Sequence, residues 1–330
     1  MNPPLLSALS PLHDEARSCF TDQLVSVVHW LGRRHELMYL ESWGFSLDSA
    51  SAKATTLGDR VHPGTGDTLA NLERYHGIRL YRLNPQSLPE WKGILQQQWS
   101  REMPVIISMD TYTCPWDVGY QRFHSSHTCL AVGWDEGEDA IICCDAFYQK
   151  ERIAYPVSGM EGEIGPCWIF EVVGEERKDV NAQKITRLAV SHFRQLSSLE
   201  AILTFSQEIT EPEAFKKELQ ILESGHTYGS PLMLSLLDVA RFRKLMAQLF
   251  RYLNQLDYSR HLEAFQSEFE EAARRWAVIR AMFIKAQHLR QPEKQAEKLA
   301  DRIREAASQE QRLSSDMLEW SCQATERDNR

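Results

Sequence analysis

The first half of the chain mixes helical and extended hydrophobic spacing. Apolar residues that share one helical face follow Ser18, a typical helix-capping residue, and Gly32 ends the pattern. This pattern predicts a helix from about Cys19 to Leu31. Similar spacing predicts helices at 68–75 and 88–99. Runs of β-branched and aromatic residues predict strands at 78–83, 105–109, 128–134, 140–144 and 167–173, and a short extended segment at 38–45.

The order of these elements indicates the fold class of the first half. The polar turn at 135–139 joins two of the predicted strands as a hairpin. A helix comes first and an antiparallel sheet follows. We therefore expect residues 1–177 to form an α+β domain.

The second half has the spacing of a helical bundle. Apolar residues from Leu262 to Ala286 recur at alternating steps of three and four, which is a heptad seam. Antiparallel packing inside one chain would bury this seam, and a dimerising coiled coil is the alternative, which would make the protein a homodimer. We place the domain boundary in the charged run 174–179 and expect an all-α domain at 178–330. Its helices are predicted near 181–196, 211–223, 231–255, 259–289 and 293–321.

Composition and charge narrow the classes of function. The chain has 330 residues, is 43% hydrophobic and carries a net charge of −9, which is typical of a globular protein. Nucleic-acid-binding proteins are normally basic, so that class is disfavoured. The sequence has no apolar run long enough for a membrane span and no signal-peptide pattern. Seven cysteines spread over a long chain favour a reducing cytoplasm.

The candidate chemistry depends on three residues. Cys19 lies in the first turn of a predicted helix, where unpaired amides and the helix dipole favour the nucleophilic thiolate. His127 begins one strand of the predicted hairpin and Asp145 ends the other, so antiparallel pairing brings an imidazole beside a carboxylate that can orient it. The order Cys, His, Asp on a helix and two later strands resembles the papain-like fold. We therefore expect a Cys19–His127–Asp145 triad.

Four short motifs in order resemble the N-terminal domain of butirosin-biosynthesis acyltransferases. They are Ser18-Cys19 with its helix, Trp43-Gly44-Phe45, the strand Val105–Tyr112 with its Asp110-Thr-Tyr112 end, and His127-Thr-Cys-Leu-Ala-Val-Gly-Trp-Asp followed by Asp145. The resemblance covers roughly residues 12–175. Met109 and Trp134 stand where the family tends to have Val and Tyr, and the glycine-rich run before Gly44-Phe45 is thin here.

The resemblance implies a reaction and a set of partners. Enzymes of this family move an acyl group from the phosphopantetheine thioester of an acyl carrier protein to an amine, in natural product biosynthesis. No bound cofactor is implied, because the phosphopantetheine arm arrives with the carrier protein. Papain-like enzymes often place a Gln about six residues before the Cys, so His13 is the candidate oxyanion donor here.

Further residues are candidates for substrate and partner contacts. The resemblance and the position of the loops make Trp43, Phe45, Tyr112 and Trp116 candidates for lining the cleft. Residues 1–175 carry a net charge of −10 and the remainder +1, so an acidic carrier protein should dock on the second half. The candidate docking residues on its helices are Arg241, Arg243, Arg274 and Arg275.

Two other functions are compatible with these residues. The same triad would serve a cysteine peptidase, amidase or thioesterase, with water as the acceptor. An inactive papain-like scaffold protein is the second alternative. His124 and His127 are two residues apart, but no further Cys, His or Asp at metal-ligand spacing accompanies them, so we expect no metal site.

Overall fold

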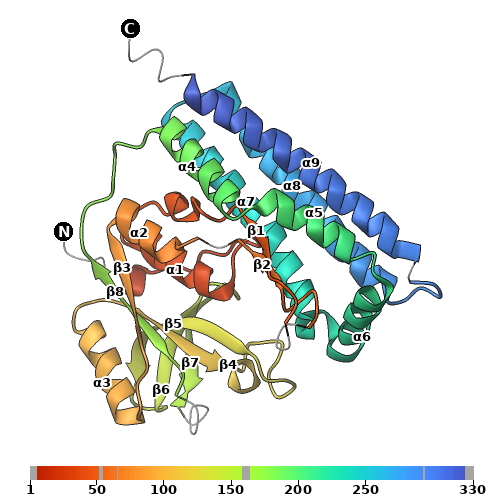
Figure 1. Cartoon of the computed structure of the whole chain (residues 1–330). Coiled ribbons are helices and arrows are strands. Elements are labelled where there is room, and N and C mark those ends of the chain that lie inside the picture. The colour runs from red at the N-terminus through yellow and green to blue at the C-terminus, as the bar shows by residue number, and fades with distance from the viewer. Residues whose placement is uncertain (1–5, 52–54, 65, 158–163, 293, 324–330) are drawn as a thin grey trace. The chain divides into compact units, whose positions relative to one another are not determined.

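The protein has an α+β architecture with a helical C-terminal region (Figure 1). The computed structural model describes residues 6–51, 55–64, 66–157, 164–292 and 294–323. The chain divides into two compact units: unit 1 comprises residues 1–37 and 69–177, and unit 2 comprises 38–68 and 178–330. Within the described ranges, no helix is both long and apolar enough to cross a membrane.

Unit 1 is built on a six-stranded sheet in which all neighbouring strands are antiparallel. The predicted strands are all present, and the turn at 135–139 joins β5 to β6 as expected. One strand, β7, was not predicted, because its first three residues are charged and only Ile153 and Tyr155 show the alternation. Across the sheet the order is β3 (Ile78–Leu83), β8 (Cys167–Val172), β4 (Val105–Asp110), β5 (Ser126–Asp135), β6 (Ala140–Asp145) and β7 (Lys150–Pro156).

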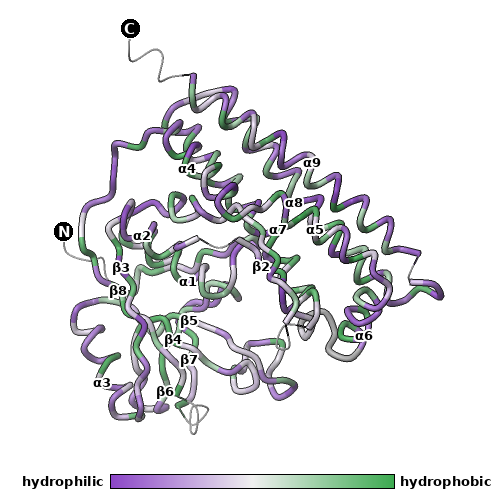
Figure 2. Tube along the Cα trace, in the orientation of Figure 1, coloured by the Kyte–Doolittle hydropathy of each residue, from purple (hydrophilic) through white to green (hydrophobic). Residues whose placement is uncertain are grey.

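One face of this sheet packs on α3 (Leu88–Trp99). Trp91 and Leu95 of α3 join a buried cluster with Ile107 and Cys129 of the central strands, which are largely hydrophobic in Figure 2. Side chains alternate between faces along a strand, so Ile106 and Leu130 are placed on the opposite face. The helix α1 (Cys19–Trp30) contacts β5 and β4.

Local signals set the ends of α1. The side chain of Ser18 accepts a hydrogen bond from the amide of Thr21, which caps the helix as predicted. Gly32 adopts a left-handed conformation with φ of 72°, which ends the helix. The second helix of unit 1, α2 (Thr68–His76), stops before Gly77. The short 3₁₀ turns of the first half are η1 (Leu6–Ala8), η2 (Glu36–Tyr39) and η3 (Thr111–Thr113).

The described residues of unit 2 form six α-helices and a two-stranded sheet. The prediction missed α5, which follows α4 after a two-residue break. The predicted extended segment at 38–45 was largely wrong, because η2 occupies its start and only Phe45 enters a strand. The helices are α4 (Ala182–Gln195), α5 (Ser198–Glu208), α6 (Pro212–Gly229), α7 (Pro231–Leu256), α8 (Arg260–Ala286) and α9 (Lys294–Cys322), and the strands are β1 (Phe45–Leu47) and β2 (Val61–Pro63).

The heptad seam of α8 is buried inside the chain. Its eight apolar residues from Leu262 to Ala286 are each at most 4% exposed. The helix packs against α7 and α9, which supply the partners that the seam needs. Antiparallel packing within one chain therefore accounts for the seam, and the seam is not available as a dimer interface.

Residues 38–68 belong to the helical unit, whereas the sequence placed them in the first domain. A fully buried carboxylate, Glu310 of α9, holds them there. It accepts hydrogen bonds from the indole nitrogens of Trp43 (2.8 Å) and Trp276 (2.7 Å). The Arg243 guanidinium pairs with Glu310 at 2.8 Å and also donates to the carbonyl oxygen of Gly44 at 2.8 Å. This buried network links the segment to three helices that lie far away in sequence.

Candidate active site

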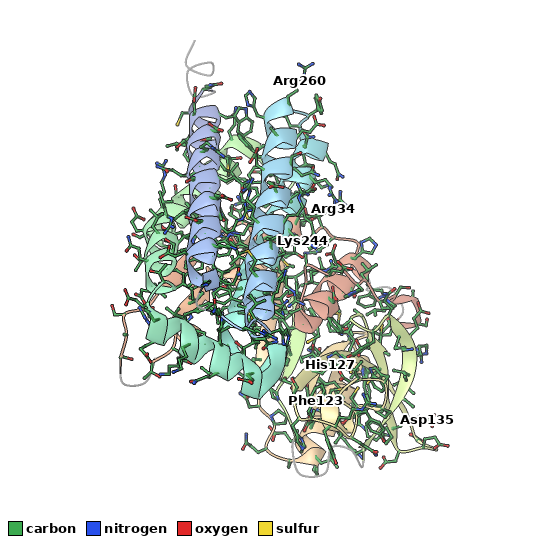
Figure 3. All side chains as sticks on the ribbon, turned by 90° about the vertical axis from the view of Figure 1, so that its right-hand side faces the viewer. Arg34, Phe123, His127, Asp135, Lys244 and Arg260 are labelled. Atoms are coloured by element: carbon green, nitrogen blue, oxygen red, sulfur yellow. The ribbon has the colours of Figure 1, made fainter. Side chains whose placement is uncertain are left out.

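Three residues predicted from sequence come together in unit 1. His127 lies at the start of β5 and Asp145 at the end of β6, two neighbouring strands. The Nε2 atom of His127 donates to Oδ2 of Asp145 over 2.7 Å. The thiol of Cys19 is hydrogen-bonded to His127. Because Nε2 is engaged by Asp145, Nδ1 is the ring nitrogen left for the sulfur. Figure 3 labels His127 near one end of β5 and Asp135 at the other.

The three groups shift each other's protonation toward an ion pair. Burial alone would raise the pKa of the Cys19 thiol, but interactions with His127 and then Thr128 outweigh burial and lower it. Burial would lower the pKa of His127, but its contacts with Asp145 and Cys19 raise that pKa to about 10. Both shifts favour a thiolate paired with an imidazolium. This is the reactive state of a nucleophilic cysteine.

Three of the buried cysteines have the opposite tendency. Burial raises the pKa of Cys114 and Cys144 to about 12, and that of Cys167 to about 11. Cys19 is only partly buried and lies at the first turn of a helix. Among Cys19, Cys114, Cys144 and Cys167, Cys19 is therefore the residue whose thiol is suited to act as a nucleophile.

Asp145 is fully buried and its carboxylate is saturated with donors. Oδ2 accepts from His127 and from the Trp116 indole at 2.7 Å. Oδ1 accepts from the backbone amide of Tyr148 at 3.2 Å and from the amide nitrogen of Gln23 at 3.3 Å. Burial raises the pKa of this carboxyl, but the interactions with His127 and Trp116 lower it overall. Asp145 is therefore an anion held in one orientation, which fixes the ring of His127.

Gln23 links the helix that carries Cys19 to both strands. Its side chain is fully buried, one helical turn after Cys19. The amide nitrogen donates to the carbonyl oxygen of Thr128 at 2.9 Å, and the amide oxygen accepts from the backbone of Ala146 at 3.1 Å. Gln23 was not among the residues predicted from the sequence. The four-residue spacing from Cys19 was the available signal, because residues i and i+4 share a helix face.

His13, the expected oxyanion donor, is oriented by a buried carboxylate. Its Nδ1 lies 2.6 Å from Oδ2 of Asp22 on α1, and Arg17 donates to Oδ1 of the same carboxylate at 2.7 Å. The ring packs edge-on against Phe147 at 5.3 Å, and Phe147 also contacts His127. His13 thus lies close to the triad, with Nε2 left for another partner.

The expected cleft residues divide into two groups. Trp116 touches the site through Asp145, and Tyr112 is 38% exposed and stacks on the ring of His124 at 4.5 Å. Trp43 and Phe45 are fully buried in unit 2, so the expectation that they line a cleft was wrong. Trp43 stacks on Phe193, and Phe45 stacks on Trp276. Their apolar surface belongs to the helical core rather than to a substrate cleft.

The four arginines expected to dock a carrier protein differ in exposure. Arg243 is fully buried in its ion pair with Glu310, so its assignment to a docking surface was wrong. The physical reason is that its position on α7 faces the neighbouring helices. The other three are at least partly exposed but pair locally: Arg241 with Asp238 at 3.4 Å, Arg274 with Glu271 at 3.0 Å, and Arg275 with Glu271 at 3.0 Å.

Side chains that could ligate a metal ion do not cluster in the part of the chain that the structure describes. There, no group of three or more His, Cys, Asp and Glu side chains is arranged to hold a metal ion. The two histidines considered together in the sequence bind separate carboxylates, His124 that of Asp110 and His127 that of Asp145. The Cys19–His127–Asp145 arrangement has the groups for proton transfer and nucleophilic attack.

Comparisons with known proteins do not assign the chain to a family. No protein-family model and no curated protein matches the chain.

Proposed function

We propose that the protein is a cysteine-dependent acyltransferase with a papain-like catalytic unit. The observation that carries the proposal is the Cys19–His127–Asp145 arrangement, in which the pKa of the thiol is lowered while those of Cys114, Cys144 and Cys167 are raised. A cysteine at a helix start, with His and Asp on neighbouring antiparallel strands, supports the papain-like assignment. The motif resemblance to butirosin-type acyltransferases supports transfer from a carrier-protein thioester to an amine.

The first half-reaction acylates Cys19. The thiolate attacks the thioester carbon, and the carbon–sulfur bond to the carrier's phosphopantetheine breaks. The imidazolium of His127 gives its proton to the departing thiolate, which leaves as a thiol. The oxyanion that forms during attack needs donors, and the backbone amide of Cys19 and Nε2 of His13 are the proposed ones.

The second half-reaction releases the acyl group. A neutral amine attacks the acyl carbon, and His127, now neutral, takes a proton from the amine nitrogen. The bond to Cys19 breaks and the sulfur leaves as a thiolate, which restores the ion pair. The products are an amide and the starting enzyme. Attack by water instead would give a carboxylic acid, which is the hydrolase alternative.

Intact-protein mass spectrometry tests this proposal. The full chain is mixed with an acyl N-acetylcysteamine thioester, and the acyl adduct is mapped by peptide digestion. We expect one acyl group on Cys19, none in Cys19→Ala, and acylation slowed by about 10⁴ in Asp145→Asn, by analogy with the serine triad. Cys322→Ala, which removes an exposed thiol of α9, is the matched control and should acylate normally.

The outcomes separate the alternatives. An adduct that yields amide when an amine is added supports the transferase. An adduct that only hydrolyses, even with an amine in excess, identifies a hydrolase. Equal labelling of Cys19→Ala and the intact chain, or no labelling at all, leaves the inactive scaffold as the remaining alternative and overturns the proposal.

A further inference from the structure

Unit 1 contains a groove that has no role in the chemistry described so far for Cys19, His127 and Asp145. Its volume is about 1010 Å³, and it lies along the ends of β4 and β5. Its lining combines polar side chains and backbone with apolar side chains such as Leu88 and Ile164, and the apolar surface is the larger share. The lining residues include Asn84, Gln86, Ser108, Asp110, His124 and Ser126.

An oriented histidine lies in the wall of this groove. The His124 side chain is 72% exposed, yet its Nδ1 lies 2.5 Å from Oδ2 of Asp110. Its ring stacks on Tyr112, with the centroids 4.5 Å apart and the planes at 16°. The other carboxylate oxygen of Asp110 accepts from the amides of Tyr112 (3.0 Å) and Ser125 (3.2 Å). An exposed imidazole is ordinarily mobile, whereas this one is held on two sides.

The contact with Asp110 also decides which nitrogen of His124 can act. Interactions with His124 and the two backbone amides outweigh burial and lower the pKa of Asp110, so it is an anion at neutral pH. Nδ1 of His124 therefore carries a proton and donates it to the carboxylate. In the neutral ring, Nε2 then bears a lone pair and can accept a proton. Asp110 and Tyr112 are the titratable groups that the structure shows in contact with this ring.

β5 links the groove to the surroundings of Cys19. Ser126 lines the groove, and Thr128, two residues further on, contacts Cys19. Side chains two apart on a strand point to the same face and lie roughly 7 Å apart. A substrate of moderate size in the groove can therefore reach the acyl group on the Cys19 sulfur.

Charge indicates what the groove binds. Asp110 is the anionic side chain in its wall, and no Lys or Arg is among the described residues that line it. A phosphate group would be repelled, which makes the groove unsuitable for the phosphate of a phosphopantetheine arm. An ammonium group would be attracted.

Amide formation from an ammonium ion releases two protons, and a second base beside His127 would accelerate it. An aliphatic amine has a pKa near 10.4, so about one molecule in 2,500 is neutral at pH 7. The ammonium must lose one proton before it attacks and a second during attack. His127 takes the second proton, and one imidazole cannot hold both. Water carries no such extra proton, so a hydrolase has no need of a second base.

We propose that this groove binds the amine acceptor as an ammonium ion, and that His124 accepts through Nε2 the proton that the amine must lose before attack. Asp110 is the positioning residue, because it fixes the ring and its tautomer. The proton moves from the ammonium nitrogen to Nε2, the neutral amine then forms the bond to the acyl carbon, and His124 releases its proton to water. This inference rests on the proposed acyl transfer and names its acceptor class.

Two acceptors of different basicity test the inference. The full chain is acylated with the N-acetylcysteamine thioester and then mixed with 1,4-diaminobutane, which is cationic at pH 7, or with hydroxylamine, which is neutral there. In His124→Gln we expect transfer to 1,4-diaminobutane to slow by about 10²-fold or more, with acylation and transfer to hydroxylamine unchanged. Asp110→Asn should give the same split, because the amide would donate to Nδ1 and leave the proton on Nε2.

A second exposed His–carboxylate pair supplies the matched control. His62 lies 3.0 Å from Asp48 in unit 2, outside the groove, and His62→Gln should leave both transfers unchanged. Equal slowing of both acceptors in His124→Gln, or no slowing of either, would overturn the inference. So would a wild-type acyl-enzyme that reacts with hydroxylamine but never with 1,4-diaminobutane. Absence of any acyl-enzyme would instead refute the proposed function, so the two failures are distinguishable.

Discussion

Gln23 offers the sharpest test of how the site is held together. Its buried side chain makes three hydrogen bonds, to Thr128, Ala146 and Asp145, and so fixes the helix that carries Cys19 against both strands. The substitution Gln23→Met removes all three bonds and keeps the volume and linear shape of the side chain. The change therefore isolates polar positioning from packing.

The expected loss of stability follows from the groups left behind. Gln23→Met leaves the carbonyl of Thr128 and the amide of Ala146 without their side-chain partner in a buried place. Each such group costs about 1–3 kcal/mol, so we expect unit 1 to lose about 2–6 kcal/mol. A typical domain has only about 5–15 kcal/mol in total. We also expect the alkylation rate of Cys19 to fall by about tenfold or more, because a small displacement separates the thiol from His127.

Two measurements on the full chain check this expectation. Urea unfolding followed by tryptophan fluorescence gives the stability change, and iodoacetamide labelling with peptide mapping gives the reactivity of Cys19. Gln309→Met is the matched control, because Gln309 is also buried and donates to a backbone carbonyl, that of Glu268 at 3.0 Å, but in unit 2. A stability loss below about 1 kcal/mol together with unchanged Cys19 labelling would refute the positioning role of Gln23.

Three further predictions concern charge. The kcat/KM for acyl transfer should rise as the pH increases through the lowered pKa of Cys19 and fall as it increases through about 10, where His127 loses its proton. The stability due to protonated His127 should be complete below its ordinary pKa of 6.5 and lost as the pH rises through about 10, and a pH series of urea titrations would contradict this if stability stayed flat. In unit 2, Glu310→Leu should cost about 3–5 kcal/mol because it leaves the Arg243 cation buried and unpaired. The double variant Glu310→Leu/Arg243→Met should recover part of that loss in thermal unfolding, and a double variant less stable than the single one would contradict the reasoning.

The predictions of structure that were confirmed depend on local signals in the sequence. The capping residue Ser18, the stop at Gly32 and the turn at 135–139 are set by neighbours in sequence, and the structure has each where it was expected. The seam of α8 was equally visible, because its spacing is regular over many residues. Such signals determine which segments are helices or strands. From the resulting order of elements, Cys19, His127 and Asp145 were expected to lie close together.

The errors about Trp43, Phe45 and Arg243 involve contacts between residues far apart in sequence. Trp43 and Phe45 were assigned to a cleft because of the motif resemblance and the position of their loop, but their partners lie on helices of unit 2. Arg243 was placed on the surface because arginines usually are. Its neighbours on the same helix face, Val239, Met246 and Phe250, are all buried, and this spacing was the signal for a buried arginine.

The buried network around Glu310 has a consequence for synthesis of the chain on the ribosome. Trp43 emerges early, but its acceptor Glu310 lies 267 residues later. At about 5–20 residues per second, the segment 38–68 waits roughly 13 to 53 s for its partner. During that interval Trp43 and Phe45 lack the helices that bury them, while residues 69–177 can already assemble the sheet. Nascent chains of this protein should therefore bind chaperones through this segment until α9 is complete.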